Sequence, residues 1–173
     1  MNTTYSVFLG LYLGSLIIRT GYELLKRAGK VNQKNMIVFV MIFAVMCLMW
    51  ASWFILCPLD PFRLALPVPI RWMGLGAVIL GLGLALGGIV QLRGLENIDH
   101  LVTTGLFAKL RHPIYTGFIL WILGWAAYHG AILSLVIGFL GIGNILYWRR
   151  LEEENLESCY GEDYQAYHRE TWF

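Results

Sequence analysis

The sequence predicts an all-α integral membrane protein with about five transmembrane helices. Of its 173 residues, 58% are hydrophobic and only 14% are charged, and the mean hydropathy is +0.62. Soluble domains are about 45–50% apolar and about 25% charged. Apolar stretches close to the roughly 20 residues that a helix needs to cross a bilayer recur along the chain. At this length we expect a single membrane domain, residues 1–173.

The first apolar stretch, residues 7–18, is predicted to be the first spanning helix. Polar Thr3 and Thr4 can extend it by lying at the membrane interface. The stretch has neither the basic start nor the small-residue cleavage pattern of a signal peptide, because its first positive side chain is Arg19. We therefore expect it to stay in the membrane.

Two further spans are predicted at residues 36–56 and 72–92. The first of them is uncharged and rich in Met, Phe and Trp. The connection between the two contains four prolines, which lack the N–H group that a helix interior needs. The later span contains six glycines, which would allow close helix packing in lipid. Among them, Gly83 and Gly87 have GxxxG spacing.

The apolar run from 114 to 147 is too long for one helix, and a polar break at 128–130 falls near its middle. This pattern predicts a helical hairpin of two spans, residues 114–127 and 131–147. The chain is polar after the second of these spans. Residues 148–173 are therefore expected to form a cytosolic helical tail.

The lysines and arginines provide an independent test of this topology. Five lie near the first loop, three in the third loop and three in the tail, against two in the second loop and none at the hairpin tip. With five spans, 11 of the 13 share one side, which the positive-inside rule assigns to the cytosol. The N-terminus is then outside and the C-terminus cytosolic. The net charge of +2 is too small to indicate a nucleic-acid partner, and the cysteines show no metal-ligand spacing.

Potentially reactive polar residues gather in the third loop, residues 93–113, and in the tail. Because the hairpin returns the chain to the same side of the membrane, we expect Arg111 and His112 near the charged run 149–154. A soluble cosubstrate would enter there, while an apolar substrate would arrive from the lipid. The cofactor-binding and catalytic half is therefore placed at residues 91–173.

Two local patterns suit ligand binding, and each also has a purely structural explanation. Residues 111–117, RHPIYTG, open the fourth span with proline in the first turn, where free N–H groups favour an anion. They also suit a membrane boundary with Tyr115 in the interfacial aromatic belt. In the tail, Arg149–Glu153 and Arg150–Glu154 have the i,i+4 spacing of an exposed charged helix. The same side chains suit a ligand, because arginine can hold a carboxylate and glutamate an ammonium.

Three segments together resemble the isoprenylcysteine carboxyl methyltransferase group, which includes phospholipid methyltransferases. They are DHLVTTGLF at 99–107, RHPIYTG at 111–117 and EEENLESCYGEDYQAY at 152–167, and the resemblance runs from Gln91 to the end of the chain. It implies a membrane enzyme without a Rossmann domain that transfers a methyl group from S-adenosylmethionine by in-line displacement. The implied acceptor is lipophilic, a small molecule or a prenylated group, and is expected to present a carboxylate, with a thiol or an amine as the alternatives.

The same resemblance implies roles for individual residues. The cofactor would contact one glutamate of the tail and a set of earlier residues: Asp99, His100, Leu101, Val102, Phe107, His112, Pro113, Ile114 and Tyr115. An arginine about one turn before that glutamate would hold the substrate carboxylate. The i,i+4 geometry pairs Arg149 with Glu153, whereas alignment on YGEDY favours Glu152. The catalytic candidates are therefore Arg149, Arg150, Glu152 and Glu153.

Two alternatives belong to other classes of protein. The RHP element and the tail are also similar to membrane sterol reductases, which use NADPH, although those proteins are usually longer and have more spans. A non-catalytic membrane protein would be able to keep the same fold for binding or assembly, because fold does not determine function.

Overall fold

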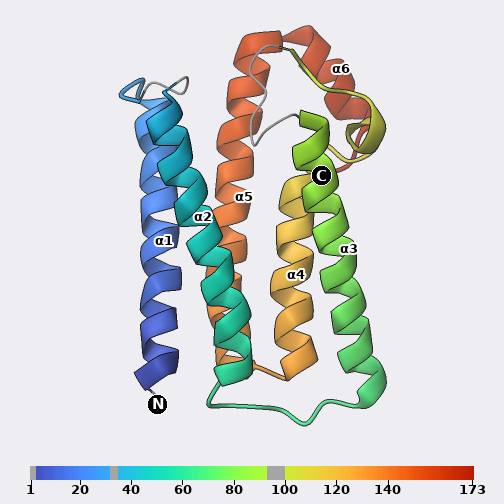
Figure 1. Ribbon diagram of the computed structural model, residues 1–173. Helices are drawn as coiled ribbons and strands as arrows, with labels where there is room; N and C mark the ends of the chain where they lie inside the picture. Colours follow the sequence, from blue (N-terminus) through green and yellow to red (C-terminus); the bar gives the residue numbers. More distant parts are fainter. Residues whose placement is uncertain (1–2, 32–34, 93–99) are drawn as a thin grey trace.

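The computed structural model describes residues 3–31, 35–92 and 100–173 (Figure 1). These residues form six α-helices and two short 3-10 helices, with isolated β-bridges but no strand of a sheet. The helices are α1 (Thr3–Arg27), α2 (Met36–Leu56), η1 (Cys57–Leu59), α3 (Val68–Leu92), η2 (Gly105–Ala108), α4 (Pro113–His129), α5 (Ile132–Tyr160) and α6 (Glu162–Glu170). The all-α prediction is therefore confirmed.

The five long helices run side by side, and α6 folds back over one end of the bundle (Figure 1). At that end lie the C-terminal ends of α1 and α3, the N-terminal ends of α2 and α4, and the last turns of α5; we call it the charged end. The opposite end holds the connection 57–67 and the turn between α4 and α5. Every described lysine and arginine except Arg63 and Arg71 belongs to segments at the charged end.

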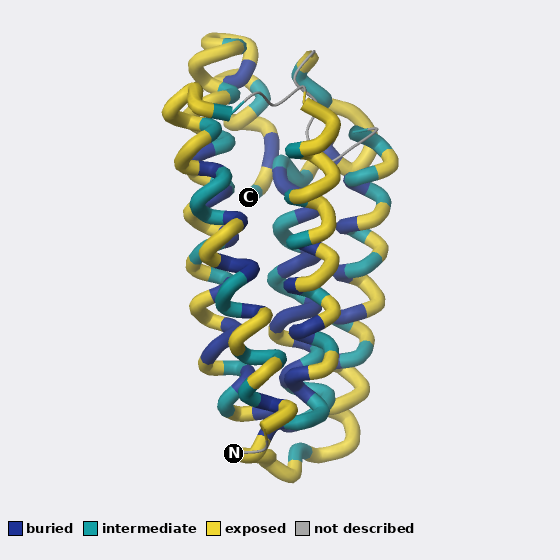
Figure 2. Tube along the Cα trace, turned by 60° about the vertical axis from the view of Figure 1, so that its left-hand side comes forward, coloured by how far each residue is buried: buried dark blue, intermediate teal, exposed yellow. Residues whose placement is uncertain are grey.

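Four helices of the described chain are long and apolar enough to cross a membrane: α1, α2 with η1, α3 and α5. Their outer faces carry many exposed apolar side chains, while the buried positions face inward (Figure 2). This is the pattern of a multi-pass membrane protein. The fifth predicted span, α4, has 17 residues and is about 26 Å long at 1.5 Å per residue, slightly less than the roughly 30 Å hydrocarbon core. The count of five spans stays a prediction.

The hairpin of α4 and α5 is present, and one glycine makes its turn. Gly130 ends α4 in the left-handed region with φ 63°, which glycine adopts without steric cost. Its carbonyl accepts a hydrogen bond from the Leu64 N–H at 2.8 Å. Beyond the turn, α5 continues to Tyr160 without a break, so the predicted boundary between span and tail at 147–148 lies inside one helix.

Glycines bring α3 and α4 into backbone contact. A Cβ on Gly81 would lie 2.6 Å from the Gly117 carbonyl oxygen, and one on Gly74 would lie 2.6 Å from that of Gly124. The contact glycines of α3 are spaced by seven residues, not four. Gly83, half of the GxxxG pair in the sequence, has no atom within 4 Å of its Cβ position, so that pair does not form the helix interface.

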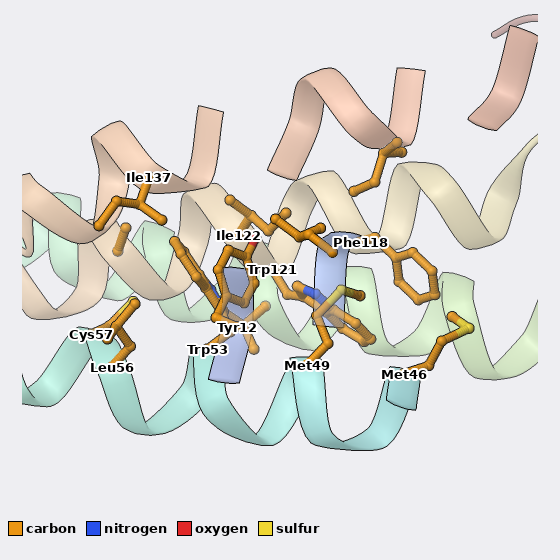
Figure 3. Packing of buried hydrophobic residues seen from close by; sticks show 14 of the residues in the cluster. Tyr12, Met46, Met49, Trp53, Leu56, Cys57, Phe118, Trp121, Ile122 and Ile137 are labelled. Atoms are coloured by element: carbon orange, nitrogen blue, oxygen red, sulfur yellow. The ribbon is translucent and has the colours of Figure 1, made fainter. Parts of the chain in front are cut away.

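An aromatic core joins α2 to α4 and α1 (Figure 3). The Trp50 ring lies 4.7 Å from Phe118 and 4.6 Å from Trp121, between centroids. Tyr12 of α1 packs against Trp53 at 5.2 Å. Met46 and Phe118 lie at the same end of the cluster in Figure 3, toward the charged end, where this core gives way to a cavity.

Candidate active site

A cavity at the charged end is lined by residues of α1, α2, α3, α4, α5 and η2 and by the segment before α4. The space between its side chains is about 440 Å³, which includes the part open to solvent. Cationic, acidic and apolar side chains from separate elements line it: Arg19, Met46, Leu92, Phe107, Arg111, His112, Pro113, Ile114, Tyr115, Phe118 and Glu152. The lining thus combines charged groups with apolar and aromatic side chains.

Six residues named from the sequence line this cavity: Phe107, His112, Pro113, Ile114, Tyr115 and Glu152. Others do not. His100 is exposed, and Leu101 and Val102 are half-buried outside the lining. Glu153 and Arg149 are not part of the lining, and the Arg150 side chain is 76% exposed. Asp99 lies outside the described residues.

Sequence reasoning did not assign five of the lining residues: Arg19, Met46, Leu92, Arg111 and Phe118. Arg111 belongs to the RHPIYTG motif and was expected near the charged run of the tail, but it was given no binding role of its own. For Arg19 a signal existed, because an ionisable residue inside a membrane helix usually has a function or a partner. Met46, Leu92 and Phe118 are ordinary apolar residues on helix faces. No local pattern distinguishes them from other lipid-facing or core positions.

His112 is the N-cap residue of α4 and is only 5% exposed. Its carbonyl accepts the Thr116 N–H at 2.9 Å and the Thr116 hydroxyl at 3.0 Å. Its ring Nε2 lies 3.2 Å from Oε1 of Glu153, and Nδ1 lies 3.8 Å from Oε2 of Glu152. The predicted approach of the RHP segment to the charged run of α5 is therefore confirmed.

Glu153 connects three cationic or polar partners. Besides His112, Nε of Arg111 lies 3.5 Å from its carboxylate and Nε of Arg149 lies 3.8 Å away. This carboxyl follows the apolar stretch of α5, in the charged turns past Trp148. The His112 hydrogen bond lowers its pKa to about 2 against the opposing effect of burial, and the neighbouring positive charges add to the lowering. Glu153 is therefore ionised at neutral pH and joins α5 to the segment before α4.

The three consecutive glutamates of α5 have different surroundings. Glu152 lines the cavity, and Glu153 lies in the cluster just described. Glu154 pairs with Arg150 of the same helix at 3.1 Å and with Arg27 of α1 at 3.0 Å. Glu152 and Glu153 both contact the His112 ring, but of the three glutamates only Glu152 is part of the cavity lining.

The last residues of the chain pair with the segment that precedes α4. The Trp172 N–H donates to the Lys109 carbonyl at 2.8 Å, and the N–H groups of Arg111 and His112 donate to Trp172 and Phe173 at 2.8 and 3.1 Å. The Tyr167 hydroxyl donates to the Phe107 carbonyl at 2.7 Å. Burial raises the pKa of Tyr167 to about 12, which keeps this hydroxyl protonated. These bonds hold the 3-10 helix η2, and with it Phe107, against the cavity.

Gln91, at the end of α3, holds η2 from the other side. Its side chain donates to the Thr104 carbonyl and accepts the Leu106 N–H at 3.0 Å. The cavity wall is therefore assembled from α3, η2, the α4 N-terminus and the tail by hydrogen bonds between segments far apart in sequence. Such an arrangement positions a small number of polar groups around a mostly apolar pocket, as ligand sites do.

Comparison with known proteins connects this half of the chain to methyltransferases. A family model described as phospholipid methyltransferase matches residues 69–163, more than half of the chain. The protein-S-isoprenylcysteine O-methyltransferase of Schizosaccharomyces pombe is 36% identical over 78 residues, covering 44% of this chain and 33% of that protein. The methanethiol S-methyltransferase of a Pseudomonas species is 29% identical over 121 residues, covering 65% of this chain and 46% of that protein.

The alignments with these curated relatives therefore span between a third and a half of the relatives' length. No solved structure matches the chain significantly. The matched region includes η2, the RHP segment, Glu152 and Glu153, so the family assignment covers most of the cavity wall. The resemblance seen in the sequence is confirmed: this chain is a multi-pass membrane protein that belongs to the phospholipid methyltransferase family.

Proposed function

We propose that the chain is an S-adenosylmethionine-dependent methyltransferase that acts on a lipophilic acceptor at the cytosolic face of a membrane. The observation that carries the proposal is the cavity at the charged end, in which Glu152 and two arginines face an apolar wall. A polar cosubstrate needs the charged part of that lining, and an apolar acceptor needs the rest. The two curated relatives are named for methyl transfer to an isoprenylcysteine and to methanethiol, which fits this division.

The residues present fit S-adenosylmethionine. Its ammonium group calls for a carboxylate, which Glu152 supplies from the wall of the cavity. Its adenine ring calls for flat apolar contacts, and Phe107 and Tyr115 line the same space. We assign Glu152 to the cosubstrate and give Glu153 a structural role, because Glu153 already lies between His112 and two arginines. When bound, the cosubstrate would supply an electrophilic methyl group on its sulfonium.

The protein's own contribution would then be positioning and exclusion of water. A carboxylate or thiolate acceptor is already nucleophilic and requires no strong general base. The wall of Met46, Ile114 and Phe118 would hold the acceptor's apolar part and keep water from the reacting groups. Holding two reactants in a reactive geometry lowers a barrier by up to about 7–11 kcal/mol, so positioning alone supports a useful rate.

The charged end is proposed to face the cytosol, with the N-terminus outside and five spans. The described lysines and arginines concentrate at this end, as the positive-inside rule requires of a cytosolic side. Although α4 is short, it lies between α3 and α5 along the bundle (Figure 1). Local thinning of the bilayer accommodates a short span at modest cost. Membrane lipid is then the partner of the outer faces.

Replacing Glu152 with glutamine is expected to raise the dissociation constant of S-adenosylhomocysteine about tenfold. A hydrogen bond to a charged group contributes roughly 1.5–3 kcal/mol. Because the Glu152 side chain is 35% exposed, we expect the loss of binding free energy to lie at the lower limit of this range. Calorimetric titration of the detergent-purified variant measures it. Glu154→Gln is the matched control, because Glu154 lies on another face of α5. Unchanged affinity in the Glu152 variant would remove this residue from the site.

A further inference from the structure

The connection 57–67 runs past the turn between α4 and α5 at the end of the bundle opposite the cavity (Figure 1). Two arginines flank this turn. Arg63 belongs to the connection and forms an isolated β-bridge with Ala131. Arg71 lies in the first turn of α3, and its Nε donates to the Tyr128 carbonyl at 2.9 Å. The two arginines therefore reach one turn from separate segments of the chain.

Each of these arginines holds the backbone with one nitrogen and keeps the rest of its guanidinium group accessible. The Arg71 guanidinium carbon lies 5.4 Å from the Tyr128 ring, over which it is fixed by the bond from Nε. Nε of Arg63 donates to the Asp60 carbonyl at 3.4 Å. Both residues are exposed, and their Nη groups make no hydrogen bond within the described part of the chain. Two positioned sets of N–H donors are thus available to a ligand.

The charge of the two arginines is not balanced by an acidic side chain. Among the described residues, Asp60 is the one acidic residue at this end, and it is buried. Its carboxylate accepts the N–H and hydroxyl of Ser134 at 2.6 Å each and the Phe62 N–H at 2.8 Å. Neither arginine forms an ion pair with Asp60 or with another described acidic residue. The surface of this end is therefore positive, which suits an anionic ligand.

Apolar and aromatic side chains surround the two arginines and continue the lipid-facing surface of the bundle. Phe62, Leu64 and Trp72 are each more than half exposed. Helix α3 has 25 residues and is about 37 Å long at 1.5 Å per residue, whereas the hydrocarbon core is roughly 30 Å thick. Its first turn, with Arg71 and Trp72, therefore reaches the headgroup layer, where tryptophan is enriched and where the phosphate groups of the lipids lie.

We propose that Arg63 and Arg71 bind the phosphate group of an anionic phospholipid in the leaflet opposite the cavity. Arginine matches the geometry of a phosphate by donating two parallel hydrogen bonds. An anionic headgroup is preferred to a zwitterionic one, because the positive surface repels the ammonium group of the latter. The bound lipid would join the connection 57–67, α3 and the turn between α4 and α5. This site is separate from the cavity and does not depend on methyl transfer.

The test is native mass spectrometry of the delipidated full-length protein, titrated in detergent with dioleoylphosphatidylglycerol. In the variant Arg63→Gln/Arg71→Gln, the dissociation constant of the tightest lipid site is expected to rise about tenfold, because charge-assisted hydrogen bonds to the phosphate are lost. Arg27→Gln/Lys30→Gln is the matched control, since it removes two exposed positive charges at the charged end. This control should bind the lipid like wild type, and Arg71→Lys should bind it with intermediate affinity.

Two further ligands separate the phosphate from the rest of the lipid. Dioleoylglycerol, which lacks the phosphate, should not occupy the site in wild-type protein. Inorganic phosphate should bind far more weakly than the lipid, and equal affinity would indicate a site for the free ion instead. Undiminished lipid affinity in Arg63→Gln/Arg71→Gln, or an equal loss in the control, overturns the inference.

A second measurement uses wild-type protein alone, so it does not depend on how the variants fold. Phosphatidylglycerol that carries a photoreactive group on its headgroup glycerol is bound to the protein and activated by light. Peptide mass spectrometry should then find the label within residues 57–72 or 128–131. Labelling confined to the charged end contradicts the proposed site.

Discussion

Replacing Glu153 with alanine is expected to separate the end of α5 from the segment before α4 and to abolish measurable S-adenosylhomocysteine binding. The substitution leaves His112, Arg111 and Arg149 without their shared carboxylate. Breaking a buried ion pair by removing one partner costs about 3–5 kcal/mol. Because this side chain is 20% exposed, we expect about 2–3 kcal/mol. His112 and Arg111 both line the cavity, so their displacement also deforms the site.

The adjacent glutamate is the control for this change. Glu154 is 42% exposed and pairs with Arg150 and Arg27, which are 76% and 61% exposed. Exposed ion pairs contribute about 0–1 kcal/mol, so Glu154→Ala should scarcely alter the melting temperature or ligand affinity. Thermal unfolding in detergent, followed by tryptophan fluorescence, and titration with S-adenosylhomocysteine measure both effects. Similar losses in the two variants would contradict the different roles assigned to these neighbours.

Alanine at Gly81 and alanine at Gly83 should change stability in opposite directions. The added methyl group at Gly81 would lie 2.6 Å from the Gly117 carbonyl oxygen and 3.1 Å from the Leu120 Cβ, so α3 and α4 must move apart. Overpacking of this kind typically costs about 1–3 kcal/mol. Gly83 has open space around its Cβ position, and replacing a helical glycine with alanine there is worth about 0.5–1 kcal/mol in favour of the helix.

Melting temperatures of the two variants in the same detergent test this prediction. At roughly 2–4 °C per kcal/mol for a chain of this size, we expect the melting temperature to fall by several degrees for Gly81→Ala and to rise slightly for Gly83→Ala. Gly81→Ala should also weaken ligand binding, since α4 carries His112 to Tyr115 at the cavity. Equal melting temperatures would mean that the close approach of α3 and α4 at Gly81 does not determine stability.

Local patterns predicted the helices well, because each depends on residues near one another in sequence. The second span was predicted at the bounds that α2 has, since its uncharged stretch is bordered by polar residues and proline. The break at Gly130 predicted the hairpin, because glycine supplies the left-handed turn residue. In contrast, α1 extends well past residue 18. Its charged turns are helical and contain the Arg19–Glu23 ion pair, which hydropathy does not reveal.

Sequence patterns could not predict the contacts between segments that are far apart in the sequence. Buried Asp60 accepts the backbone N–H and hydroxyl of Ser134 at 2.6 Å each and so caps α5 from another loop. The tail pairs with residues 109–112, and Arg19 enters the cavity from α1. The sequence alone also did not distinguish Glu152 from Glu153 as the glutamate that contacts the cosubstrate. That assignment depends on which face of α5 meets the RHP segment. Each of these features requires the register between helices, which no local spacing specifies.

The most direct test of the central claim is calorimetric titration of the detergent-purified wild-type protein with S-adenosylhomocysteine, with NADPH as the parallel ligand. Saturable binding of S-adenosylhomocysteine alone, at one site per chain, is the predicted result. Binding of NADPH alone would contradict the methyltransferase and favour a reductase. If neither ligand binds, in protein shown to be folded by its thermal transition, a catalytic role is contradicted. The chain would then be a membrane protein that keeps the family's fold for binding.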